Sequence, residues 1–194
     1  MNELSEYVTD VNADIAKKSI ACFGTIIIRL PSISLNVTDQ LKNFLMLKIN
    51  YVTTATMLVL KDVLRKYPNY IEHFYAFINK DILEQINDGP SKQAFVWILG
   101  QFGEQIDDSP YILEKLFEDD LENAQVDMMK YLAVASTKLF FKRSPEMHGV
   151  LSKVYKHVLK TSCDADLRQK VMFYYKLMSQ NMQIAEKIIC SSMA

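Results

Sequence analysis

The sequence is poor in glycine and proline, with only 5 of each among its 194 residues. An all-β fold needs these residues in its many turns, so their scarcity argues against that class. Hydrophobic residues make up 49% of the chain and aromatic residues 11%, which excludes a disordered tail. A chain of this length and composition is expected to bury roughly 70% of its unfolded surface around a core.

No sign of charge dominates, because 22 Lys and Arg face 23 Asp and Glu for a formal net charge of −1. The chain as a whole therefore has no field that would attract nucleic acid or a membrane. The three cysteines, Cys22, Cys163 and Cys190, form no CxxC pair, and such a sparse, odd set is typical of a reducing compartment. The first residues lack the basic and apolar regions of a signal peptide, and no apolar run is long enough to span a membrane. We expect a soluble, cytosolic chain.

Apolar residues recur at steps of three and four along nearly the whole chain, which is the period of amphipathic helices. The stripes are Ile20, Phe23, Gly24, Ile27 and Ile28; Val52, Ala55, Val59, Val63 and Leu64; Ala94, Trp97, Ile98 and Gln101; Val126, Met129, Leu132, Ala133 and Leu139; and Met172, Tyr175, Leu177 and Met178. Shorter helices are predicted between them, at 37–47, 69–79, 110–121, 146–160 and 181–190. Pro68, Gly89-Pro90, Ser109-Pro110 and Ser144-Pro145 mark helix boundaries.

The long helices start near residues 12, 50, 91, 123 and 164, at intervals of about 32 to 41 residues, close to the period of HEAT and armadillo repeats. Each helix pair has a face that only its neighbours can bury. We therefore predict an all-α fold, a right-handed α-solenoid of five HEAT/armadillo-like helix pairs forming one segment, residues 1–194. The apolar end Ile188-Ile189-Cys190 lacks the polar face of a capping repeat, so we expect the array to continue in a longer protein, with a short protein that has a sticky end as the alternative.

The stretch from Ser91 to Ile106 is predicted to be one helix that carries the single tryptophan, Trp97. Two glycines, Gly100 and Gly103, interrupt its apolar run, although a glycine inside a helix costs roughly 1 kcal/mol relative to alanine. Their presence predicts a neighbouring helix that comes too close for a side chain, and a largely buried Trp97.

No pattern in the sequence predicts catalysis, a cofactor or a metal. His73, His148 and His157 lie on three predicted helices, without an HExxH motif or a cysteine at ligand spacing. Phosphate-binding glycine loops and the GxSxG nucleophile elbow are also missing. The aromatic run Phe173-Tyr174-Tyr175 has no basic groove beside it in the sequence, so core packing is favoured over base stacking. We expect no enzyme and no nucleic-acid partner.

Two charged clusters remain as candidate rims of a protein interface. The acidic one is Glu118, Asp119, Asp120 and Glu122, whose side chains point around a helix axis and so do not converge on a metal. The basic one is Lys153, Lys156 and Lys160 on a later helix. A solvated surface is the competing interpretation for both clusters.

Four segments, in order and across essentially the whole chain, resemble the β-type large subunits of heterotetrameric adaptor complexes, the β-adaptins. They are LSEYVTDVNADIAKKSIACFG (4–24), INYVTTATMLVLKDVLRKYP (49–68), the Trp-and-Gly helix (91–107) and ADLRQKVMFYYKLM (165–178). Within the family, Pro110–Glu114 and Phe173–Leu177 look most like the β subunit of the fourth adaptor complex. The chain departs from the family at Gln105, where Arg is usual, and at Gln169-Lys170, where Asp-Arg is usual.

The resemblance implies a scaffold segment, the C-terminal part of the adaptin trunk, in a membrane coat for vesicle-mediated protein transport. Its partners would be the N-terminal domain of the medium subunit and the second large subunit. The complex would be cytoplasmic and peripheral on Golgi, trans-Golgi network or endosomal membranes. The alternatives are a stand-alone HEAT-type peptide-binding module and a helical regulatory subunit of an enzyme.

Overall fold

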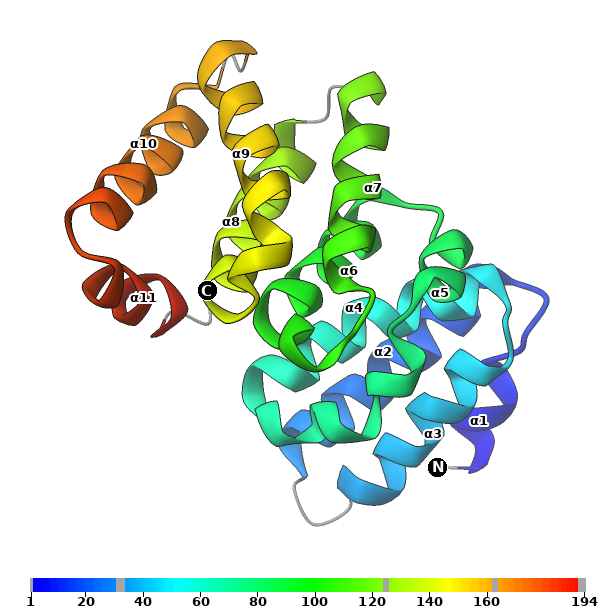
Figure 1. Ribbon diagram of the computed structural model, residues 1–194. Helices are drawn as coiled ribbons and strands as arrows, with labels where there is room; N and C mark the ends of the chain where they lie inside the picture. The colour runs from blue at the N-terminus through cyan, green and yellow to red at the C-terminus, as the bar shows by residue number, and fades with distance from the viewer. Residues whose placement is uncertain (1, 31–33, 124–125, 162–163, 192–194) are drawn as a thin grey trace. The chain divides into compact units, whose positions relative to one another are not determined.

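The computed structural model describes residues 2–30, 34–123, 126–161 and 164–191, and their secondary structure is helical (Figure 1). The chain divides into two compact units, Met1–Phe95 and Val96–Ala194. The predicted all-α class is confirmed, because the described residues include no strand.

The first unit is built on α2 and α4, which pack along each other. Its elements are α1 (Asn2–Tyr7), α2 (Ala13–Arg29), α3 (Ser34–Met46), α4 (Asn50–Lys66), two 3₁₀ helices, η2 (Pro68–His73) and η3 (Tyr75–Phe77), and α5 (Lys80–Gln85). The predicted stripe on α2 lies in the core, with Ile20, Phe23 and Ile27 fully buried. The ring of Phe23 meets that of Phe44 from α3 edge-on, with centroids 5.1 Å apart.

The helix predicted at 69–79 is wrong: this stretch forms η2 and η3, and α5 begins only at Lys80. Its apolar residues Ile71, Phe74 and Ile78 are buried all the same. A 3₁₀ helix has three residues per turn, so the apolar step of three from Ile71 to Phe74 suits it as well as it suits an α-helix. The side chain of Asn79 accepts a hydrogen bond from the Ile82 amide (3.1 Å), and this N-cap starts the new helix at that point.

The second unit is arranged around α8, which contacts α7, α9, α10 and α11. Helix α6 (Gly89–Phe102) crosses the boundary between the units, and it is followed by η4 (Gly103–Gln105), α7 (Ser109–Asn123), α8 (Val126–Lys142), α9 (Ser144–Thr161), α10 (Ala165–Gln180) and α11 (Met182–Ser191). The predicted starts of the long helices agree with the structure to within three residues. The helix predicted to reach Ile106 ends at Phe102, and the hydroxyl of Ser109 donates to the carbonyl of Gly103 (2.7 Å) at this junction.

Polar bonds fasten α8 to its neighbours in this unit. The hydroxyls of Thr137 on α8 and Tyr155 on α9 share a buried hydrogen bond of 2.7 Å. The guanidinium of Arg143 donates to the carbonyls of Ile106 (2.9 Å) and Asp107 (3.0 Å), which closes the loop before α7. These two hydrogen bonds hold the loop before α7 against the end of α8.

Trp97 is 8% exposed, as predicted, and its ring contacts that of Phe102 edge-on at 6.2 Å. Gly100 lies where α6 crosses α8. A Cβ built on Gly100 would stand 2.7 Å from the Cα of Ala135 and 2.8 Å from its Cβ. The predicted close approach is therefore confirmed, and the contact is with the backbone of α8.

Candidate partner-binding surfaces

The charged residues proposed as interface rims lie on two neighbouring helices, α7 and α9. Glu118 and Asp119 are exposed near the end of α7, while the side chains of Asp120 and Glu122 lie outside the described residues. Lys153, Lys156 and Lys160 are exposed on α9.

The two clusters are joined rather than separate, which the sequence did not indicate. The amine of Lys153 donates to Glu114 of α7 (2.7 Å) and lies 3.6 Å from Glu118. These carboxylates raise the pKa of Lys153, first through the hydrogen bond to Glu114. Lys153 therefore offers a partner less free charge than Lys156 or Lys160, since a docking carboxylate would have to displace Glu114.

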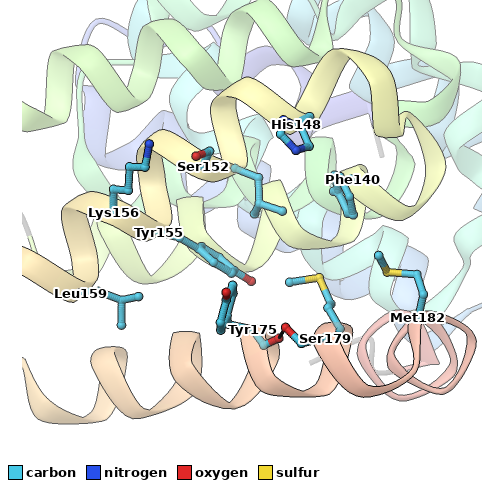
Figure 2. Close-up of a pocket in the computed structure, with 11 residues that line it drawn as sticks. Phe140, His148, Ser152, Tyr155, Lys156, Leu159, Tyr175, Ser179 and Met182 are labelled. Atoms are coloured by element: carbon cyan, nitrogen blue, oxygen red, sulfur yellow. Dashed lines mark hydrogen bonds between the residues drawn. The ribbon is translucent and has the colours of Figure 1, made fainter.

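A groove of about 570 Å³ runs between α9 and α10 (Figure 2). Most of its lining is apolar or aromatic, and it draws on α8 and α11 as well as on its two flanking helices. The lining residues are Phe140, His148, Leu151, Ser152, Tyr155, Lys156, Leu159, Tyr175, Met178, Ser179 and Met182. Tyr155 and Tyr175 enter the groove from opposite helices, and Lys156 stands on the α9 side (Figure 2).

The groove lies where neither α9 nor α10 buries all of its apolar side chains. Val150, Val154 and Val158 bury one face of α9 against the unit's core, whereas Leu159 on another face is only half-buried. On α10 the fully packed residues are Leu167 and Val171, both in the first half of the helix. The second half of α10 leaves its apolar side chains to line the groove or to face solvent.

The aromatic run of α10 is not in the core, contrary to the sequence interpretation. Phe173 is 53% exposed and Tyr175 is 56% exposed. Further exposed apolar residues of this unit continue the surface over both last helices: Met172, Met182, Ile184 and Ile188. Large exposed apolar patches of this kind mark sites of protein association.

The His, Cys, Asp and Glu side chains of the described residues are the groups that could ligate a metal. No group of three or more His, Cys, Asp or Glu in the described ranges has the arrangement of a metal site. His157 packs against the ring of Phe117 at 5.8 Å, and His148 lines the groove on α9. Each of these histidines thus has a packing role or a surface position.

Two further titratable groups of this unit have pKa values that burial raises. Burial raises the pKa of the Tyr155 phenol, which shares its hydrogen bond with Thr137. Burial also raises the pKa of the Cys190 thiol. Cys22 is exposed, and Cys163 lies outside the described residues. The thiolate is the reactive form of cysteine, and the raised pKa lowers the thiolate fraction of Cys190.

Lys138 of α8 is 3% exposed, and burial lowers the pKa of its ammonium group. A lysine perturbed in this way is a signature of some active sites. It does not line the α9–α10 groove.

Comparison with known proteins decides the family. The model of the adaptin N-terminal region matches residues 1–182. The chain belongs to this family. It is 30% identical over 189 residues to beta-adaptin-like protein A of Arabidopsis thaliana, covering 97% of this chain and 22% of that protein. It is 29% identical over 188 residues to the human AP-1 complex subunit beta-1, covering 96% and 20%.

A relative from a different complex matches over the same extent. The AP-2 complex subunit beta of Schizosaccharomyces pombe is 26% identical over 191 residues, which cover 98% of this chain and 28% of that protein. The chain thus spans less than a third of the length of each of these relatives. Within the described residues, none of the helices combines the length and hydropathy that crossing a membrane requires.

Proposed function

We propose that this chain is a scaffold segment in the trunk of a β-type large subunit of an adaptor complex, acting in vesicle-mediated protein transport. The observation that carries the proposal is that β subunits of two different adaptor complexes match over 96–98% of the chain. The exposed apolar residues of α10 and α11 support the proposal, because exposed apolar surface is typical of sites of protein association. A stand-alone peptide-binding module is not favoured, because it would not account for this match.

The proposed partners are the N-terminal domain of a medium subunit and the second large subunit. The complex would be cytoplasmic and peripheral on Golgi, trans-Golgi network or endosomal membranes. Among the complexes, the fourth is proposed because Pro110–Glu114 and Phe173–Leu177 resemble its β subunit. The role would be structural, without catalysis, cofactor or metal, and sequence-level charge balance supports the absence of a nucleic-acid partner.

The test is co-expression of the chain with the N-terminal domains of medium subunits from several adaptor complexes, followed by affinity purification. We expect stoichiometric co-purification with one of them, strongest with that of the fourth complex. Stable subunit interfaces often bury more than about 2,000 Å² in total, so the complex should survive size-exclusion chromatography. Failure to bind any medium subunit, even with upstream repeats added, would contradict the proposed function while leaving the fold unaffected.

The structure also sharpens the test of the charged rims. Reversing Lys153 alone would break its contact with Glu114, so a loss of binding would have two explanations. The double variant Lys153→Glu with Glu114→Lys restores the internal pair and inverts the charges at both positions. If this double variant binds as the parent does, then the rim does not contact the partner at Lys153. If the double variant and Lys153→Glu both lose binding, then the rim does contact the partner there.

A further inference from the structure

The groove between α9 and α10 combines a largely apolar lining with Lys156 on its rim, and none of its described lining residues is acidic. This combination restricts the chemistry of an occupant. We propose that the groove is a docking site for an acidic amphipathic α-helix supplied by another protein chain. The inference stands on the groove itself and goes beyond the assembly role proposed above.

The floor of the groove suits the apolar face of a helix. Leu151, Leu159, Met178 and Met182 supply aliphatic and thioether side chains from three helices, and Tyr155 closes the base. Two helices that flank a groove present a hollow into which side chains spaced at i, i+3, i+4 and i+7 of a third helix can insert. Methionines adapt their shape to such side chains, because they are unbranched and flexible.

The charges at the groove indicate which charge a docking helix should carry. Helices α9 and α10 together carry six Lys and Arg against two acidic residues, although the chain as a whole has a net charge of −1. Lys153 is offset by Glu114, but Lys156 lies on the rim of the groove itself. None of the eleven described residues that line the groove is acidic. A helix whose flanks carry Asp or Glu therefore gains attraction here, and one with Lys is repelled.

Other occupants fit these observations less well. A second copy of the chain placed symmetrically on this surface would bring the Lys156 side chains of both copies to one interface without an acidic lining residue to offset them, which opposes association. A nucleic acid would need several cations along its phosphates, and Lys156 is the one Lys or Arg among the described lining residues.

The probe is a short fluorescein-labelled peptide of high helix propensity, with leucines at i, i+3, i+4 and i+7 and glutamates on both flanks. A matched peptide keeps the leucines and carries lysine in place of every glutamate. Binding to the full chain is measured by fluorescence anisotropy. We expect saturable binding of the glutamate peptide, at least about tenfold weaker binding of the lysine peptide, and a loss of that preference at high salt.

Two variants locate the binding. Lys156→Glu should lower the affinity for the glutamate peptide about fivefold and raise the affinity for the lysine peptide. Lys160→Glu is the matched control, since it makes the same charge change on α9 outside the groove lining and should alter both affinities less. Met178→Asp should abolish binding of both peptides, while circular dichroism and thermal melting report whether α10 remains folded. Met178 is only half-buried, so the fold should tolerate this change.

Equal effects of Lys156→Glu and Lys160→Glu, or no saturable binding of the glutamate peptide, would overturn the proposal. It would also be overturned by tighter binding of an oligothymidine than of the glutamate peptide, or by a dimer of the chain that Met178→Asp converts to a monomer. These results are separable from the proposed function. If the chain binds a medium subunit but not the peptide, the proposed function stands and the groove proposal is overturned. If it binds the peptide but no medium subunit, the groove proposal stands and the proposed function is contradicted.

Discussion

At the scale of single residues, Gly100 in α6 and Gly103 just after it show how a residue that lowers helix stability can indicate a tertiary contact. Gly100 lacks room for a side chain because the backbone of Ala135 occupies the space. Gly103 is less constrained: a Cβ there would lie 3.0 Å from the Ser109 hydroxyl oxygen and 3.1 Å from a methyl of Leu139. The sequence indicated that something lies close to these glycines, since nothing local favours them within an apolar helix.

The first prediction compares two helical glycines. Gly100→Ala should destabilise the chain by about 1–3 kcal/mol, because the new methyl would push α6 and α8 apart, and this outweighs the gain in helix propensity. Gly149→Ala is the control, since nothing lies within 4 Å of its Cβ position in α9. That change should stabilise by up to about 1 kcal/mol. Urea denaturation followed by circular dichroism gives both values, and equal effects of the two changes would contradict the close crossing.

At the scale of elements, α10 shows how a correct helix can be assigned the wrong buried face. The spacing of Met172, Tyr175, Leu177 and Met178 predicts a core stripe, yet the structure buries Leu167 and Val171 instead. Apolar residues occur on more than one side of α10, so periodicity alone leaves the buried side open. The choice is made by the neighbouring α8 and α9, which contact α10.

The N-terminus of α10 is positioned by Asp164, a residue that the sequence analysis did not single out. Its carboxylate accepts a hydrogen bond from the Leu167 amide (2.9 Å) and pairs with Lys130 of α8 (2.8 Å). An aspartate before a helix is recognisable as an N-cap from sequence. Its ionic partner lies on a helix that is distant in the sequence and is known only from the fold.

The second prediction concerns stability at acid pH. The hydrogen bond from Lys130, followed by that from the Leu167 amide, lowers the pKa of Asp164 below its usual value of 3.8. A carboxyl with a lowered pKa stabilises the fold above pH 3.8, and this contribution is lost as the pH falls through the folded-state pKa. Asp164→Asn keeps an N-cap oxygen but removes the charge.

The measurement is the Tm of the parent and of Asp164→Asn across a pH series. The parent should melt at the higher temperature near neutral pH, and the difference should shrink as the pH falls below 3.8. Lys130→Met should show the same convergence, because it removes the other half of the pair. A Tm difference that stays constant over the whole acid range would show that Asp164 acts through its cap alone.

At the scale of the whole molecule, the second unit leaves a broad apolar surface on its last two helices. Phe173, Tyr175, Ile184 and Ile188 are each about half exposed. A monomer gains little by presenting this surface to water, whereas an assembly subunit can bury it against a partner. The isolated chain is therefore expected to self-associate, and co-expression with its partner should raise its solubility.

The third prediction tests that surface with two neighbouring positions of α11. Ile184 is 50% exposed in the first turn, where an aspartate also suits the helix dipole, so Ile184→Asp should reduce self-association and change stability by less than about 1 kcal/mol. Ala185 is fully buried, so Ala185→Asp should destabilise by about 3 kcal/mol or more. Sedimentation velocity over a concentration series and thermal melting give the two readouts. Unchanged self-association of Ile184→Asp would show that α11 is not part of the sticky surface.

The sequence by itself determined the helical class, the starts of the long helices and the tight packing around Trp97 and Gly100. These features follow from short-range patterns: apolar period, caps, and the local cost of glycine. It also determined the family, through segments spread over the whole chain. It could not separate η2 and η3 from an α-helix, because both meet the same apolar spacing.

Only the tertiary structure decided which charges are paired within the chain and which remain exposed. Lys153 and Glu118 lie 35 residues apart in the sequence, and their approach depends on how α7 packs against α9. The groove between α9 and α10 has the same origin, since its walls come from four helices and no single segment encodes it. Periodicity states that a helix has an apolar face, but whether that face is core or contact surface depends on which neighbours reach it.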